Sequence, residues 1–285
     1  MDFSLTVQTR ITDWHFIKYL EDLGYDAAWI PDTQMMWSDC YATMALAAQN
    51  TSKIRLGTGV AIAGTRIAPT TAAAISSINA LAPGRVFLGI GTGHTAMRVM
   101  GQDPIPISEF REYLRVVRAM LHGEETEYTY KGKTTSIVWQ EHGDGFRNIE
   151  TPIPIYVAAN GPRALRTAGM YGDGLCSIFN EQIPVLVFNL NNVAEGAKIA
   201  KRSTKDFHTT TLTNAVILKA GDRLQDDAVI ERAGSWAVTA LHFVYEIWRY
   251  TKDDNVVPEY MKSIWEEYSD HVANFPVPEE KSHQL

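Results

Sequence analysis

The sequence predicts an α/β fold in which parallel strands alternate with helices that cover the outside of the sheet. Short apolar segments and longer segments with a helical pattern alternate seven times along the chain, which is typical of βα units. The first strand segment, 3–8, alternates apolar and polar residues, and the strands as a group are apolar and similar in length. These features favour a (β/α)8 barrel over an open doubly wound sheet, although an eighth, closing strand is not evident.

Helix caps and proline mark the first four units. The predicted strands cover 3–8, 26–30, 53–60 and 85–90, and the helices after them cover 14–23, 40–49, 70–81 and 108–121. Asp13 can cap the first helix and Gly24 can end it, because these residue types satisfy the free backbone groups at helix ends. Pro69 stands at the start of the third helix, where proline is favoured.

An insertion after the fourth helix interrupts the alternation. Residues 124–152 contain a predicted hairpin that turns at Lys131-Gly132. The alternation then resumes, with strands predicted at 155–158, 174–177 and 208–219 and helices at 162–171, 183–201, 222–249 and about 259–275. We therefore expect residues 1–285 to form a single barrel domain, with a closing strand that the sequence does not reveal.

Composition restricts the partners and the location of the protein. The 285 residues carry 26 Lys and Arg against 33 Asp and Glu, a net charge of −7, and no basic block. This argues against nucleic acid as a partner. No apolar run approaches the roughly 20 residues that span a bilayer, and the N-terminus lacks a signal-peptide pattern. We expect a cytoplasmic protein with no membrane contact.

Cysteine and histidine give no sign of a metal site. The two cysteines, Cys40 and Cys176, have no metal-binding spacing and are interpreted as small core residues. The eight histidines form no metal-binding motif, so we expect no metal ion.

Two glycine-rich strand ends are the clearest candidates for a binding site. They are Gly89-Ile-Gly-Thr-Gly-His94 and Val157-Ala-Ala-Asn-Gly-Pro162. Backbone without side chains can approach a ligand closely, and the free N–H groups of the following helix suit a phosphate. The alternatives are a tight turn at the glycines and a simple helix cap at Asn160. We expect a large phosphorylated cofactor, held by Thr92, Gly93, Ala158, Ala159, Asn160, Gly161 and Pro162.

Three polar residues near these strand ends could carry chemistry. His94 is the best acid–base candidate, because histidine ordinarily titrates near neutral pH; the alternative is a structural or solvated histidine. Asp32 ends the second strand and is the other catalytic candidate. It could also cap a turn, order the loop beside the cofactor or hydrogen-bond the cofactor's edge. Arg66 could be a cation near the cofactor or substrate, or a surface arginine paired with a carboxylate.

The loop after Asp32 has an unusual composition. It contains Met35, Met36 and Trp37, and three large side chains in a strand-end loop predict the wall of a substrate pocket. A nicotinamide site is not indicated, since the glycine spacing before His94 does not match the dinucleotide-binding fingerprint.

Four segments, in this order, resemble the bacterial luciferase-like family of flavin- and deazaflavin-dependent oxidoreductases, particularly the branch with methylene-tetrahydromethanopterin reductase. The likeness spans residues 3 to about 219. It is carried by Leu23-Gly-Tyr-Asp-Ala-Ala-Trp-Ile-Pro-Asp32, Ile54-Arg-Leu-Gly-Thr-Gly-Val60, Leu81-Ala-Pro-Gly-Arg-Val-Phe-Leu-Gly-Ile-Gly-Thr-Gly93 and Ala158-Ala-Asn-Gly-Pro-Arg-Ala-Leu-Arg-Thr-Ala-Gly169, followed by Asp173-Gly174.

The resemblance implies a TIM barrel that binds FMN or 8-hydroxy-5-deazaflavin (coenzyme F-420) at the strand C-terminal ends. It also implies a non-proline cis peptide, which maps to Gly59-Val60, behind the cofactor ring. The chain departs from its relatives in having Thr33 where many have His, and His94 where some deazaflavin dehydrogenases have Glu. No closing strand and helix resembling the family's follow residue 219.

Two functions follow from this resemblance. The first is an oxidoreductase that acts on a small organic substrate, either a monooxygenase that uses reduced FMN and O2 or an enzyme that transfers hydride with a deazaflavin. Reduced FMN would come from a partner flavin reductase, and we expect a homodimer. The second is a degenerate member that binds flavin without catalysis or serves as a partner subunit, as the missing His at position 33 would allow.

Overall fold

The structure is a computed structural model that describes residues 1–141, 145–178 and 183–274. The chain divides into two compact units, Met1–Leu212 and Thr213–Leu285. The first contains the sheet and its helices, and the second contains further helices. The expectation of a single domain remains a prediction.

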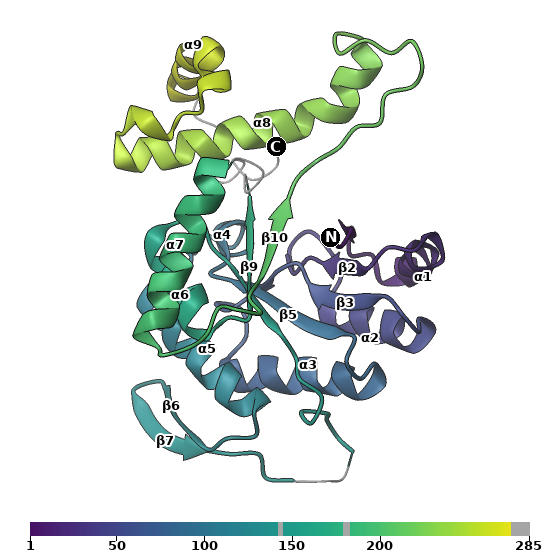
Figure 1. Cartoon of the computed structure of the whole chain (residues 1–285), viewed down its shortest axis with the longest axis vertical. Helices are drawn as coiled ribbons and strands as arrows, with labels where there is room; N and C mark the ends of the chain where they lie inside the picture. Colours follow the sequence, from purple (N-terminus) through teal and green to yellow (C-terminus); the bar gives the residue numbers. More distant parts are fainter. Residues whose placement is uncertain (142–144, 179–182, 275–285) are drawn as a thin grey trace. The chain divides into compact units, whose positions relative to one another are not determined.

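The sheet of the first unit is parallel and follows the order β1-β2-β3-β5-β8-β9-β10, with the short β4 beside β5 (Figure 1). The predicted strand at 155–158 has the predicted bounds. The strands are β1 Ser4–Thr6, β2 Ala27–Ile30, β3 Arg55–Thr58, β4 Ala61–Ile62, β5 Val86–Gly91, β8 Ile155–Ala158, β9 Gly174–Ile178 and β10 His208–Leu212.

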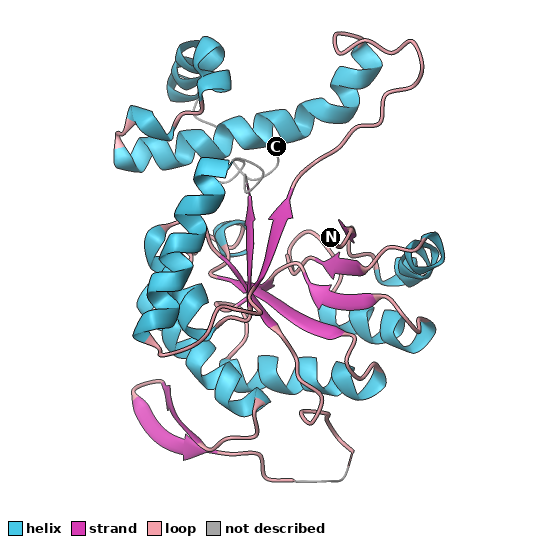
Figure 2. Cartoon of the chain, viewed as in Figure 1, coloured by secondary structure: helices cyan, strands magenta, loops and turns pink. Residues whose placement is uncertain are grey.

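Helices connect these strands and lie around the outside of the sheet (Figure 2). Gly24 ends the first helix in a left-handed conformation, with φ of 88°, as the sequence predicts. Asp39 caps the second helix by accepting a hydrogen bond from the N–H of Ala42. A 3-10 turn, Ile11–Asp13, leads into α1. The helices of this unit are α1 Trp14–Leu23, α2 Cys40–Asn50, α3 Ala68–Leu81, α4 His94–Arg98, α5 Ile107–Leu121, α6 Pro162–Tyr171 and α7 Ile183–Ile199.

Aromatic side chains show that the sheet is curved like a barrel wall. The ring centroids of Trp29 on β2 and Tyr156 on β8 lie 5.8 Å apart, and Phe87 on β5 contacts both rings. Because β3 and β5 separate β2 from β8, a flat sheet would hold those strands about 14 Å apart. His208 of β10 stacks on Tyr156 at 5.4 Å. The concave face is therefore filled by the sheet's own side chains, as inside a small barrel.

The opposite face of the sheet packs against the helices. Leu56, Leu88 and Val157 point to this side and are fully buried in the main apolar core, together with helix residues such as Ile75 and Leu114. Burial on both faces explains why β2, β5 and β8 have no polar alternation, whereas β1 and β10 at the ends of the sheet order are partly exposed and rich in serine and threonine. The prediction of a parallel α/β fold with outer helices is confirmed.

Three predicted strands are clearly shorter than expected. The strand predicted at 3–8 covers only Ser4–Thr6. The strand predicted at 53–60 stops at Thr58, and the chain resumes as β4 after the Gly59-Val60 peptide. The strand predicted at 208–219 stops at Leu212, which is also the last residue of the first unit. Within the described residues, the sheet has eight strands, of which β4 lies off the main order beside β5. The order runs from β1 to β10, and no strand that closes the barrel between these two is seen in the described residues.

The predicted hairpin is confirmed within the insertion. Strands β6 Thr126–Tyr130 and β7 Lys133–Ile137 pair antiparallel. Lys131 and Gly132 between them have φ angles of 50° and 77°, as a two-residue turn with left-handed positions requires. In the part of the chain that the structure describes, no helix is long and apolar enough to cross a membrane.

The second unit is helical and has its own small core. It contains α8 Asp227–Thr251, two 3-10 turns at Asp254–Val256 and Glu259–Met261, and α9 Lys262–Asn274. Trp248 on α8 and Trp265 on α9 meet edge to face at 5.9 Å. Tyr245 packs against both tryptophans. The helices predicted at 222–249 and about 259–275 thus have close counterparts, although residue 275 lies outside the described residues.

A buried carboxylate ties α1 to the start of β3. Glu21 accepts hydrogen bonds from the N–H groups of Ser52, Lys53 and Ile54 at 2.8, 2.5 and 3.0 Å. Its carboxylate also lies 3.3 Å from the ammonium of Lys18. Burial alone would raise the pKa of Glu21, but these donors lower it from 4.5 to about 2.

We expect this carboxylate to make stability depend on acid pH. Because the folded-state pKa is depressed, the stabilisation is present above pH 4.5 and is lost as the pH falls towards about 2. Glu21→Gln should lower the free energy of unfolding near neutral pH by roughly 3 kcal/mol and flatten its dependence on pH in that window. Urea unfolding at several pH values measures both effects. Glu195→Gln, at an exposed carboxylate, is the control; an unchanged pH slope in Glu21→Gln would contradict the assignment.

Candidate cofactor and substrate site

The strand C-terminal ends meet at one rim, as the sequence predicts. A Cβ on Gly91, at the end of β5, would lie 3.2 Å from the Cβ of Ala158 on β8 and 3.4 Å from Cγ2 of Val60. The carboxylate of Asp32, just after β2, accepts a hydrogen bond from the N–H of Ile62 at 3.3 Å. Four segments far apart in the sequence therefore supply neighbouring groups.

Small residues at this rim leave backbone where side chains would otherwise stand. The Gly59-Val60 peptide is cis, which confirms the expectation drawn from the family resemblance. Gly89 has a packing reason to be glycine: a Cβ there would lie 2.2 Å from the carbonyl oxygen of Thr58 and 2.8 Å from the ring of Trp29. Gly93 has a φ of 89° and precedes α4, so a left-handed residue is required there.

The start of α6 is open. Gly161 is the N-cap residue and Pro162 the first helical residue. No described heavy atom would lie within 4 Å of a Cβ on Gly161 beyond its chain neighbours. The side chain of Asn160 is used within the fold: its Oδ1 accepts hydrogen bonds from Ser177 Oγ at 2.6 Å and from Ile178 N at 3.4 Å. Asn160 therefore joins β8 to β9 and leaves the exposed first turn of α6 accessible to an anion.

Asp32 and Arg66 form a buried ion pair beside this rim. Arg66 Nη1 lies 2.5 Å from Asp32 Oδ2, and Arg66 Nη2 lies 2.7 Å from Asp39 Oδ2. The Asp32 side chain is 2% exposed and that of Arg66 20%. The guanidinium also lies 4.8 Å from the centroid of the Tyr41 ring. The sequence offered the pairing of Arg66 with a carboxylate as one alternative, but it did not indicate the partner Asp39.

The two cysteines are not placed as nucleophiles. Cys40 is fully buried, and burial followed by the charge of Asp32 raises its pKa far above the ordinary thiol value. Cys176 is half-buried against the aromatic cluster of the barrel interior, and burial raises its pKa to about 11. Both therefore remain thiols at physiological pH, consistent with the packing role expected from the sequence. Among the described residues, no group of three metal-ligand side chains is seen.

His94 and the tip of loop 33–38, which follows β2, are exposed at the rim. His94 is the first residue of α4 and faces solvent. Met35 and Met36 are 65% and 50% exposed, and Trp37 is half-buried. The loop is tied to α4 by Gln34, whose Nε2 contacts the carbonyl oxygen of Ala96 and the sulfur of Met100, both at 3.0 Å. The sequence gave no signal for Gln34, because its partners lie more than sixty residues away.

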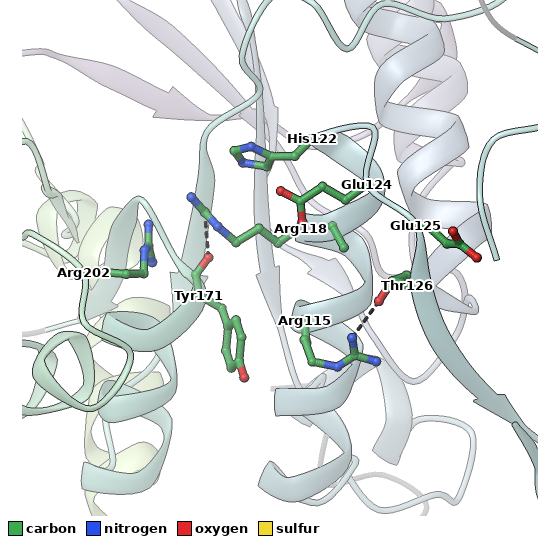
Figure 3. A pocket seen from close by; sticks show the side chains of 9 residues that line it. Arg115, Arg118, His122, Glu124, Glu125, Thr126, Tyr171 and Arg202 are labelled. Atoms are coloured by element: carbon green, nitrogen blue, oxygen red, sulfur yellow. Dashed lines mark hydrogen bonds between the residues drawn. The ribbon is translucent and has the colours of Figure 1, made fainter. Parts of the chain in front are cut away.

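A pocket of about 530 Å³ lies elsewhere, at the strand N-terminal ends (Figure 3). Arg118 and Arg202 there share one oxygen of Asp173, at 2.8 and 2.9 Å. Arg118 also donates to the carbonyl of Tyr171, the last residue of α6, and Arg202 donates to the carbonyl of Gly172, which follows α6. Asp173 Oδ2 accepts from the N–H of Ile155, the first residue of β8. These donors serve the fold, and the pocket includes none of the predicted site residues. It is lined by Arg115, Arg118, Ala119, His122, Glu124, Glu125, Thr126, Tyr171 and Arg202.

Comparison with known proteins identifies the family. The model of the luciferase-like monooxygenase family matches residues 14–274. The chain belongs to this family. The match includes β2, the cis peptide, both glycine-rich strand ends and the helices of the second unit.

The most similar proteins include several deazaflavin enzymes. A 5,10-methylenetetrahydromethanopterin reductase of Methanolobus tindarius is 33% identical over 197 residues, covering 67% of this chain and 57% of the relative. An F-420-dependent glucose-6-phosphate dehydrogenase of Beutenbergia cavernae is 28% identical over 241 residues, covering 78% and 67%. The chain therefore spans between half and two thirds of the length of these relatives.

A solved structure supports the barrel. The coenzyme F-420-dependent tetrahydromethanopterin reductase of Methanopyrus kandleri superposes with a TM-score of 0.69 and 25% identity, covering 98% of this chain and 83% of that one. The predicted TIM-barrel-like fold and the predicted family are confirmed by these comparisons.

Proposed function

We propose that this family member is an oxidoreductase that binds coenzyme F-420 or FMN at the strand C-terminal ends and acts on a small organic substrate. The observation that carries the proposal is the rim itself. Small residues of β5 and β8 meet the cis peptide beside an open helix N-terminus. The names of the relatives favour the deazaflavin, so hydride transfer is our first choice and flavin monooxygenation the second.

The residues at the rim fit such a cofactor. The first turn of α6 would hold the phosphate, because its exposed N–H groups and the helix dipole favour an anion, and Thr92 and Gly93 would contact the same part. Val60 and Ala158, which are half-buried neighbours of Gly91, would contact the ring. When bound, a deazaflavin supplies hydride transfer and a reduced FMN supplies oxygen activation. The proposed cofactor-binding set is Gly59, Val60, Thr92, Gly93, Ala158, Ala159, Asn160, Gly161 and Pro162.

The remaining rim residues would orient the substrate and move a proton. His94, which is exposed at the start of α4, would exchange protons with a bound substrate. Asp32 is held by Arg66 and by the N–H of Ile62, so we propose that it acts by ordering the rim rather than by proton transfer. Met35, Met36 and Trp37 would form the apolar wall of the substrate pocket. The homodimer, the flavin reductase and the cytoplasmic location remain predictions.

A cofactor titration tests this proposal. We expect the purified protein to bind coenzyme F-420 more tightly than FMN, followed by the change in cofactor absorbance. Gly161→Asp should weaken binding of either cofactor by about tenfold or more, because it places a carboxylate where the phosphate should sit. Ser77→Asp, which adds the same charge to an exposed site on α3, is the control. If wild-type protein binds neither cofactor, the proposal fails; if folded Gly161→Asp binds as wild type does, the phosphate assignment fails.

A further inference from the structure

One guanidinium joins the two ends of the loop that carries the proposed substrate wall. Asp32 immediately precedes loop 33–38 and Asp39 immediately follows it. Arg66 contacts both carboxylates, at 2.5 and 2.7 Å. Asp39 also caps α2 through its other oxygen, Oδ1, at 2.9 Å from the N–H of Ala42. The arginine therefore fixes where the chain leaves β2 and where it enters α2.

The same ion pair connects the loop to the cis peptide segment. Asp32 Oδ2, which accepts from Arg66, also accepts from the N–H of Ile62 on β4. β4 begins directly after the Gly59-Val60 peptide. A shift of the Arg66 side chain would thus affect both the loop and β4.

We propose that Arg66 is a positioning residue: it holds the two ends of loop 33–38 in place at the rim and does not act as a cation for the cofactor. Its role in substrate binding rests on the function proposed above, but the contacts themselves do not. Two carboxylates face one guanidinium, so the cluster of Arg66, Asp32 and Asp39 carries a net negative charge. Both terminal nitrogens of Arg66 are engaged in these pairs. A phosphate would meet repulsion there.

Between its two ends, the loop is held by Gln34, whose Nε2 contacts the carbonyl oxygen of Ala96 and the sulfur of Met100. Its tip, Met35 and Met36, is exposed. Its internal hydrogen bonds run from the N–H groups of Met36 and Trp37 to the carbonyl of Thr33, at 2.9 and 3.0 Å. The N–H of Ser38 donates to the backbone carbonyl oxygen of Thr9 at 2.8 Å. These three amides therefore report whether the loop ends are held.

Hydrogen exchange in cofactor-free protein tests the proposal, because the charge and the cap of Asp39 can be separated. Asp39→Asn keeps a good N-cap for α2 but removes the charge; Asp39→Glu keeps the charge with a poorer cap. We expect Asp39→Asn to speed exchange in the peptide covering 33–38 by about tenfold, and Asp39→Glu to stay much closer to wild type. Glu195→Gln removes a comparable arginine partner, 2.7 Å from Arg166, and should leave this peptide unchanged.

Arg66→Lys separates positioning from cofactor binding. A lysine ammonium cannot pair with two carboxylates as the planar guanidinium of arginine does. The amide hydrogens of loop 33–38 should therefore again exchange faster than in wild type. Cofactor affinity should stay within about threefold of wild type, since no cofactor contact is lost. With a substrate in hand, Asp39→Asn should raise KM more than it lowers kcat. Loop protection unchanged in both Asp39→Asn and Arg66→Lys would overturn the proposal. So would a large loss of cofactor affinity in Arg66→Lys with loop protection intact. Wild-type protein without cofactor affinity would instead contradict the function and leave the exchange result valid.

Discussion

His94→Ala is expected to lower kcat by roughly 10²–10⁴-fold, the usual contribution of one general acid or base. His94 starts α4 directly after Gly93, and its side chain faces solvent at the rim. We propose His94 as the proton-transfer group because it is the one histidine among the residues proposed for this rim, where position 33 is threonine. Cofactor affinity should change far less than turnover, because we propose that other residues contact the phosphate and the ring.

The comparison variants for His94 are chosen to separate chemistry from packing. His94→Gln keeps hydrogen bonding and much of the volume, yet it should lose the proton transfer and remain slow. His15→Ala, at an exposed histidine on α1, should have wild-type turnover. Single-turnover cofactor reduction with saturating substrate gives the rate. If both His94 variants turn over within about threefold of wild type, His94 is only part of the pocket wall and the chemistry rests on the cofactor.

Arg66→Met is expected to be the most destabilising single substitution at the rim. It would leave the carboxylate of Asp32, which is 2% exposed, without its cation. Removing one partner of a buried ion pair typically costs about 3–5 kcal/mol, because the other charge remains buried and unpaired. Urea unfolding at neutral pH measures the loss of stability.

A second substitution shows whether the buried charge is responsible. Asp32→Asn in the Arg66→Met background removes that charge and should recover a large part of the loss. Arg166→Met breaks an exposed pair with Glu195 and should cost about 1 kcal/mol or less. A loss in Arg66→Met no larger than in Arg166→Met would show that the Asp32 pair contributes little to stability.

Local signals in the sequence were sufficient for most of the elements. The strand Ile155–Ala158 and the helix Pro162–Tyr171 have the predicted bounds, because an apolar run ends at an Asn-Gly-Pro cap that both stops the strand and starts the helix. The strand predicted to continue to 219 did not, and Ile217 within it is 87% exposed. An apolar run shows strand propensity, but it does not show that a neighbouring strand is available to pair with it.

The site was only partly predictable for a related reason. Glycines and caps act on their own backbone, so Gly93 and Gly161 could be found from the sequence. The contacts of Arg66 with Asp32 and Asp39 join residues 34 and 27 positions apart. Gln34 contacts a residue 62 positions away. Such pairs form only because the curved sheet brings the strand ends together. The spacing of residues along the chain does not reveal which of them will meet.

The most direct test of the account is the structure of the protein with its cofactor bound. We predict that the ring of coenzyme F-420, or of FMN, packs against Val60 at the strand C-terminal ends, and that its phosphate accepts hydrogen bonds from the first turn of α6 at Gly161. A cofactor bound instead in the pocket of Arg118, His122 and Arg202, at the opposite ends of the strands, would contradict the central claim.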